Sequence, residues 1–160
     1  MFGLLSCMAL LILGCKSSRV FRSSGTLVTI EEKGRAVCLL RTEDGTHVRL
    51  SGKLEKGLVG LPGSHVLLEG ELRPSVPYPE VDVRNYTILS ISGKRPFVGV
   101  LREEDGRFLL ESYEGRALEL DVGSLKEGAL PKPGATLWVT GSVVGDTLRV
   151  ERFGVLAPWD

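Results

Sequence analysis

The sequence predicts an all-β protein in which two similar units follow an apolar N-terminal segment. Glycine accounts for 20 of the 160 residues and aromatic residues for only 6%. This composition is typical of many short strands joined by tight turns. A pattern of glycine and apolar residues also occurs twice, at residues 25–92 and again at 99–158. Repetition of this kind predicts a duplicated β unit.

The first element is the apolar segment at residues 1–15, which contains no charged side chain. A helix of this length would reach about 22 Å, less than the roughly 30 Å of a bilayer core. A cleaved signal segment is therefore favoured over a transmembrane helix. A buried N-terminal helix or strand is the alternative.

The end of this segment, Leu11-Ile12-Leu13-Gly14-Cys15, resembles the lipobox of bacterial lipoproteins. The resemblance implies signal cleavage after Gly14 and a diacylglycerol thioether on Cys15. It places the protein in the bacterial cell envelope, attached to the membrane through its N-terminal lipid and facing the periplasm. Lys16 rather than Asp follows Cys15, which under the sorting rule of that family indicates the outer membrane.

A tether is expected at residues 16–24, followed by the first unit at 25–92. Its five expected strands are 25–32, 36–41, 46–50, 64–72 and 81–91. Lys33-Gly34 and Asp44-Gly45 provide residues that tolerate the positive φ of tight hairpins. Residues 52–63 are too many for a hairpin and leave room for a short helical turn. Cys38 lies in an apolar run, which predicts a packing role for its thiol.

A linker is expected at residues 93–98, and the second unit at 99–158. The five strands of this unit are expected near 97–103, 107–113, 117–122, 135–144 and 147–155. Gly52-Lys53-Leu54, which follows the third strand of the first unit, has its counterpart in Gly123-Ser124-Leu125. The differences between the units are confined to turns, as a duplicated domain should show.

Three consecutive strands, a short helical connection and a closing pair follow the order of the OB-fold. Each unit has an opening Gly-x-Val/Leu strand, a Pro-Gly before the fourth strand and a Gly ending the core-facing run of that strand. These features are similar to OB-fold domains of exported bacterial proteins of the BOF type. The resemblance implies two tandem five-stranded Greek-key barrels; tandem SH3-like barrels are the alternative. It also implies binding on the second and third strands and on the loops after the first and fourth.

No arrangement of catalytic residues is found, and we expect neither enzymatic activity nor a metal or cofactor. His47 and His65 have no partner at metal-ligand spacing, and Gly-x-Ser-x-Gly is absent. Glu103-Glu104-Asp105 gathers three carboxylates, which we interpret as a solvated turn rather than a weak calcium site.

The loop at residues 73–80 replaces the tight Gly145-Asp146 turn of the second unit. Its three prolines stiffen it, and an exposed tyrosine is a common contact residue. Arg73, Tyr78 and Glu80 are therefore the candidate interaction site. The alternative is a rigid loop with Tyr78 folded back on the barrel.

Charge is balanced, with 20 Lys and Arg against 20 Asp and Glu. Binding to a phosphate backbone relies on a basic surface, so no nucleic-acid partner is expected. The leading interpretation is a lipid-anchored envelope protein that acts as a binding or scaffolding module, with an envelope protein as a partner. An oligosaccharide or small-ligand module is the alternative, and a module for single-stranded nucleic acid ranks third.

Overall fold

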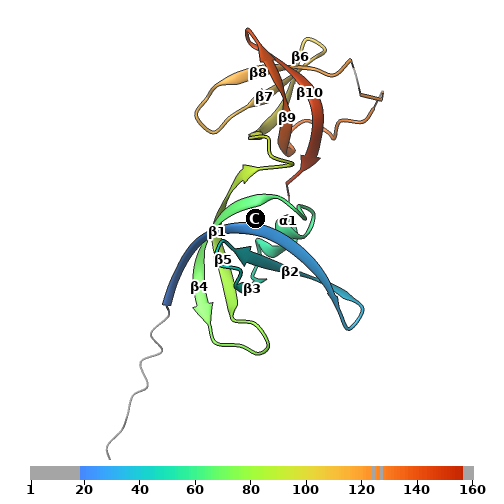
Figure 1. The fold of residues 1–160 in the computed structure, drawn as a ribbon. Helices are drawn as coiled ribbons and strands as arrows, with labels where there is room; N and C mark the ends of the chain where they lie inside the picture. Colours follow the sequence, from blue (N-terminus) through green and yellow to red (C-terminus); the bar gives the residue numbers. More distant parts are fainter. Residues whose placement is uncertain (1–18, 124, 127, 157–160) are drawn as a thin grey trace, which may run out of the picture.

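The computed structural model describes residues 19–156, except 124 and 127. It contains two closed five-stranded β-barrels, one after the other along the chain (Figure 1). The first barrel consists of β1 (Arg19–Glu32), β2 (Arg35–Thr42), β3 (His47–Ser51), α1 (Glu55–Val59), β4 (His65–Arg73) and β5 (Glu80–Ser90). The second consists of β6 (Phe97–Glu104), β7 (Arg107–Glu111), β8 (Ala117–Asp121), β9 (Thr136–Val144) and β10 (Thr147–Val155). The predicted signal segment, Gly14 and Cys15 lie outside the described residues.

Strand order identifies both barrels as OB-folds. In the first barrel the order is β1-β2-β3-β5-β4, and β4 pairs back onto β1 to close the ring. All pairs are antiparallel except β3 with β5, which are parallel. The second barrel repeats this order as β6-β7-β8-β10-β9. The short α1 occupies the connection between β3 and β4, so the predicted OB-fold is confirmed over the SH3-like alternative.

Glycines in matching places of the two barrels allow neighbouring strands to approach closely. At each of them a Cβ atom would overlap a backbone carbonyl oxygen of the next strand, so no larger residue fits without a shift of the backbone. The pairs of glycine and carbonyl are Gly25 with Arg41, Gly99 with Glu111, Gly70 with Asp82, and Gly141 with Arg149.

Inward-facing apolar side chains fill each barrel. Fully buried members of the first core include Leu27, Leu40, Leu50 and Val81, and α1 contributes Leu58. Burying a side chain of this kind stabilises the fold by about 1.5–3 kcal/mol. A separate core fills the second barrel and includes Leu101, Leu120, Leu137 and Leu148.

The structure corrects the expected tether at residues 16–24, because β1 begins at Arg19. Residues Arg19 to Thr26 pair with β4, whereas Gly25 to Glu32 pair with β2. The first half of β1 thus supplies partners for backbone N–H and C=O groups of β4 that would otherwise form an open sheet edge. Its sequence is largely polar and its partner is distant along the chain, so a local pattern does not reveal it.

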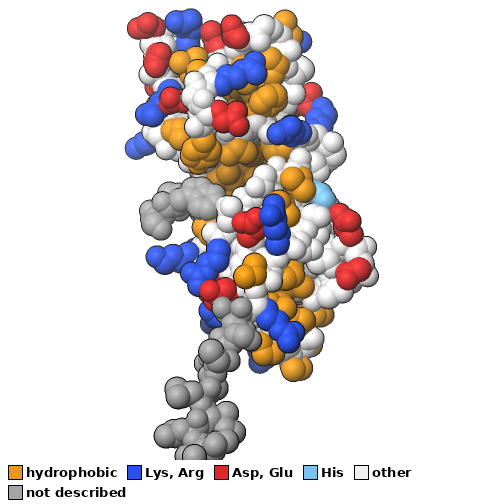
Figure 2. Space-filling model, turned by 90° about the vertical axis from the view of Figure 1, so that its left-hand side faces the viewer, with side chains coloured by type: hydrophobic (Ala, Val, Ile, Leu, Met, Phe, Trp, Pro, Cys, Tyr) orange, Lys and Arg blue, Asp and Glu red, His pale blue; other side chains and the backbone are white. Residues whose placement is uncertain are grey.

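The two barrels are packed against each other. Trp138 of β9 is only 8% exposed and belongs to the same cluster of buried residues as Tyr86 and Ile88 of β5. Leu156, after β10, is buried in this cluster as well. Hydrophobic side chains are visible where the barrels meet (Figure 2). The barrels therefore share a buried apolar contact as well as a covalent connection.

Two polar contacts cross the same junction. The Lys94 ammonium pairs with the Glu151 carboxylate, and the Arg152 guanidinium donates to the Ser92 hydroxyl over 3.0 Å. These groups are exposed, so each contributes at most about 1 kcal/mol, and apolar burial dominates the junction.

Over the described residues, no helix has the length and apolar character required to span a membrane.

Candidate binding groove at the barrel junction

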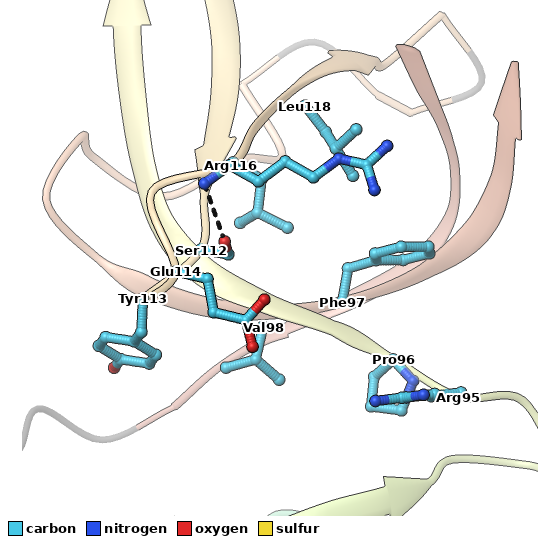
Figure 3. Close-up of a pocket in the computed structure, with 10 residues that line it drawn as sticks. Arg95, Pro96, Phe97, Val98, Ser112, Tyr113, Glu114, Arg116 and Leu118 are labelled. Atoms are coloured by element: carbon cyan, nitrogen blue, oxygen red, sulfur yellow. Dashed lines mark hydrogen bonds between the residues drawn. The ribbon is translucent and has the colours of Figure 1, made fainter. Parts of the chain in front are cut away.

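A pocket of about 550 Å³ opens on the second barrel beside the connection from the first (Figure 3). Arg95 comes from the connection, Phe97 and Val98 from the start of β6, and Tyr113 and Arg116 from the turn between β7 and β8. Segments that are separated in sequence thus combine to form one wall. Phe97 and Tyr113 project from opposite sides of the opening (Figure 3).

The turn between β7 and β8 is held by hydrogen bonds. The Ser112 backbone N–H donates to the Arg116 carbonyl over 2.8 Å, and the Arg116 backbone N–H donates to the Ser112 hydroxyl over 3.2 Å. Gly115 adopts a φ of 79°, which other residues rarely adopt. These constraints fix the backbone that carries Tyr113 and Arg116 at the rim.

A smaller hollow of about 220 Å³ lies beside this pocket and is lined in part by the first barrel. It includes Tyr86 and Ile88 of β5 together with Leu156, and it shares Val98 and Tyr113 with the larger pocket. We call the two hollows together the junction groove. Its two ends belong to different barrels, so its shape depends on how the barrels pack.

The ends of the junction groove differ in chemistry. The exposed cations Arg95 and Arg116 lie at the second-barrel end, where Glu114 is the single acidic residue of the lining. The first-barrel end is almost entirely apolar, and burial there raises the pKa of the Tyr86 phenol. Tyr113 stands between the two ends and is 71% exposed.

This arrangement suits a particular kind of ligand. Guanidinium groups form paired hydrogen bonds with carboxylates and phosphates, and aromatic rings offer rigid apolar contact area. An elongated molecule with an anionic group at one end and an apolar segment at the other would match both ends of the groove.

The sequence did not indicate these residues, although one signal was present. The turn Ser112-Tyr113-Glu114-Gly115 carries an aromatic side chain, whereas its counterpart Thr42-Glu43-Asp44-Gly45 is wholly polar. Arg95 falls in the expected linker, where sequence alone assigns no site.

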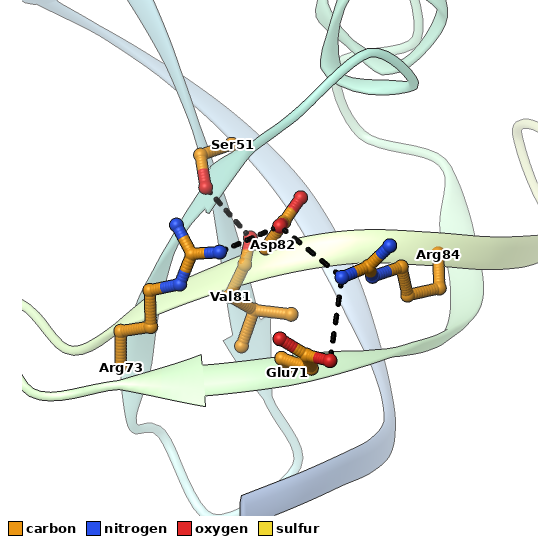
Figure 4. A network of polar contacts seen from close by, with 6 residues as sticks. All are labelled: Ser51, Glu71, Arg73, Val81, Asp82 and Arg84. Carbon is orange, nitrogen blue, oxygen red and sulfur yellow. Dashed lines mark hydrogen bonds and ion pairs between the residues drawn. The ribbon is translucent and has the colours of Figure 1, made fainter. Parts of the chain in front are cut away.

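The predicted interaction residues lie elsewhere, at the end of the first barrel remote from the second (Figure 1). Arg73 pairs with Asp82 over 2.8 Å, and Arg84 pairs with Glu71 over 3.3 Å in the same network (Figure 4). Glu80 begins β5 and lies opposite Arg49 in the sheet. Their side chains are thus arranged around the β4–β5 loop.

Tyr78 is half-buried, and its ring centroid lies 6.1 Å from that of His47. The ring therefore packs against the barrel, which agrees with the alternative expectation of a rigid loop with Tyr78 folded back. The exposed side chain at the tip of the loop is instead Val76, at 93%.

The carboxylates of Glu103, Glu104 and Asp105 are exposed around the turn between β6 and β7. Within the described ranges, no three His, Cys, Asp or Glu side chains are grouped so that they would hold a metal ion. Cys38 is a buried free thiol in the first core.

No family model matches this sequence, and neither does any curated protein. Among solved structures, the chain is similar to a deletion mutant of the single-stranded DNA-binding protein from Thermus aquaticus. The two sequences are 18% identical, the match covers 87% of this chain and 94% of the other, and the TM-score is 0.29. A likeness of this strength carries no argument about what the present chain binds.

The expectation that excluded nucleic acid as a partner is nevertheless corrected. The expectation rested on net charge, and the solved structure that this chain resembles is that of a DNA-binding protein. The physical reason is that net charge sums over the whole surface, whereas binding depends on local charge, such as the two arginines of the junction groove.

Proposed function

We propose that this protein is a non-enzymatic binding module of the bacterial cell envelope. A diacylglycerol on Cys15 would attach it to the outer membrane, facing the periplasm, and the junction groove would hold the ligand. The lipobox-like residues before Cys15 support the attachment. The observation that supports binding is the groove itself, which combines two arginines and three aromatic rings with other apolar side chains.

The packing between the barrels supports this role, because it preorganises the groove. Trp138 and Leu156 are buried against the first barrel, so the two walls are held before a ligand arrives. A preformed site loses little conformational entropy on binding. The ligand class that fits is an anion with an apolar segment.

The groove is tested with anilinonaphthalene sulfonate, a fluorescent anion with an apolar ring system. We expect saturable binding that weakens at least about tenfold in Arg95→Gln/Arg116→Gln, because each lost charge-assisted contact is worth 1 kcal/mol or more. Tyr113→Ala should weaken binding of this dye and also of neutral N-phenylnaphthylamine, because the ring contributes apolar contact.

Arg41→Gln is the matched control, since Arg41 is an exposed arginine of the first barrel outside the groove. Equal affinity of the double variant and this control would refute the assignment of the groove. Displacement of the dye by a single-stranded oligonucleotide would instead assign the groove to nucleic acid.

Attachment is tested separately by mass spectrometry of the N-terminus, with Cys15→Ala as the control. The proposal requires a diacylglycerol on Cys15 and recovery of the protein with membranes. An unmodified Met1 in the soluble fraction would contradict it.

A further inference from the structure

We infer that the end of the first barrel remote from the second rests on the bilayer, with the β4–β5 loop at the level of the lipid headgroups. We call this end the basal surface; it consists of Arg19, Val20 and residues 73–80. The inference rests on the proposed lipid at Cys15 and adds a second membrane contact, made by the folded protein itself.

The covalent chain limits how far this end can lie from the membrane. Arg19 begins β1 four residues after Cys15. A chain extends at most about 3.6 Å per residue, so Arg19 lies within about 14 Å of Cys15. A lipid chain buried in the bilayer holds Cys15 at the interface. The part of the barrel next to Arg19 is therefore the part that meets the headgroups.

The sheet register shows which residues those are. Arg19 lies opposite Leu72 and Val20 opposite Glu71, so the start of β1 is adjacent to the end of β4. The β4–β5 loop begins directly after that end (Figure 1). The start of β1 and the loop therefore approach the membrane together.

The basal surface carries the two most exposed large apolar side chains of the described residues, Val76 at 93% and Val20 at 88%. Between Arg73 and Glu80 the loop contains no charged side chain and three prolines. Removing an exposed valine side chain from water is favourable, because its apolar surface no longer has to be hydrated. A rigid, uncharged loop loses little entropy or charge solvation when it enters the headgroup region.

Ion pairs surround this apolar tip. Arg22 pairs with Glu69 over 3.1 Å, and Arg73 and Arg84 pair with Asp82 and Glu71 (Figure 4). These arginines are matched by carboxylates, and within the basal surface the charge of Glu80 balances that of Arg19, so net attraction to anionic lipid is small. The contact should therefore depend on apolar insertion and change little with lipid charge or salt.

The second barrel provides the comparison. At the equivalent position it has the two-residue turn Gly145-Asp146, next to Val144, which is 71% exposed. This turn is short and contains a charge. The membrane-directed barrel alone has the long uncharged loop.

The test places an environment-sensitive fluorescent amino acid at position 76, or at position 144 as the control, by stop-codon suppression in the full chain. The mature lipoprotein is reconstituted in vesicles of phosphatidylcholine, with or without phosphatidylglycerol. We expect a blue shift at position 76 in both vesicles and about threefold less quenching by iodide than at position 144, because insertion shields the probe from water.

Equal quenching at the two positions, in protein shown by mass to carry its lipid, would overturn the inference while leaving the proposed attachment intact. If mass analysis finds no lipid, the proposed attachment fails. In that case the protein is joined at Cys15 to a maleimide lipid, and the probes at positions 76 and 144 test whether the basal surface contacts the bilayer.

Discussion

Cys38 links burial to a measurable dependence of stability on pH. Its thiol lies within the first core, where burial, aided by the nearby Glu55 carboxylate, raises its pKa from 9.0 to about 11. In the unfolded chain the thiol ionises near pH 9, whereas in the folded chain it stays protonated until about pH 11. The stabilisation is therefore complete below pH 9 and is lost as pH rises toward 11.

We expect the free energy of unfolding to fall between pH 8 and pH 10 by about 1.4 kcal/mol more in the natural protein than in Cys38→Ala. Urea unfolding of both proteins at the two pH values measures this difference. Ionisation of lysine and tyrosine affects both proteins alike and cancels. An identical loss in the two proteins would show that the thiol does not titrate in this way.

At this scale the sequence was informative about the backbone and less so about side chains. The repeated glycines at 25 and 99 could be recognised, because a close approach of strands excludes every larger residue. The roles of Arg73 and Tyr78 could not, because their partners Asp82 and His47 are set by the folded sheet. Arg116 likewise joins the groove only when β7 and β8 are in place.

At the scale of elements, strands bounded by Gly-containing turns were predicted near their observed positions, since these signals are local. The first half of β1 was missed because it depends on β4 for its hydrogen bonds. Phe21 of this segment packs against the core. Its neighbours Arg22, Ser23 and Ser24 are polar, so the sequence of the segment does not look like a buried strand.

Removing that half of β1 tests its structural role. A chain that starts at Gly25 should have a free energy of unfolding about 2–4 kcal/mol lower than one that starts at Arg19. It loses the packing of Phe21 and leaves the β1-facing edge of β4 without a partner over residues 67–72. Denaturant unfolding measures the difference. Light scattering should also detect association of the shorter chain through the open edge.

The chain that starts at Arg19 is the control, and it should match the stability of a chain that starts at Lys16. If the chain from Gly25 were equally stable and monomeric, residues 19–24 would act as the tether that the sequence suggested.

At the scale of the whole molecule, the packing between the barrels should make them unfold together. Trp138→Ala removes a large side chain that lies over Gly154 and contacts the first core, and it should cost about 3–5 kcal/mol. We expect calorimetry to record one unfolding transition in the natural protein and two separate transitions in the variant.

Val144→Ala is the matched control, because Val144 lies on the same strand but is exposed. This substitution should leave the single unfolding transition unchanged. Two transitions in the natural protein, with no change in Trp138→Ala, would show that the barrels are independent. The junction groove would then lack a fixed shape.

The groove shows why the site was harder to predict than the fold. Each barrel follows from local turns and alternating strands, which one sequence displays. The groove needs Tyr86 from one barrel, Tyr113 from the other and Leu156 after the last strand. No pattern within a single unit contains all three.

The position of Leu156 also affects the order in which the protein is completed. The first core begins at Leu27, yet the cluster around it includes Trp138 and Leu156 from nearly the other end of the described chain. During synthesis, the first barrel therefore presents an uncovered apolar face until almost all of the second has emerged. Chains that stop before β9 would keep that face exposed. Such chains should therefore be bound by chaperones or degraded by proteases.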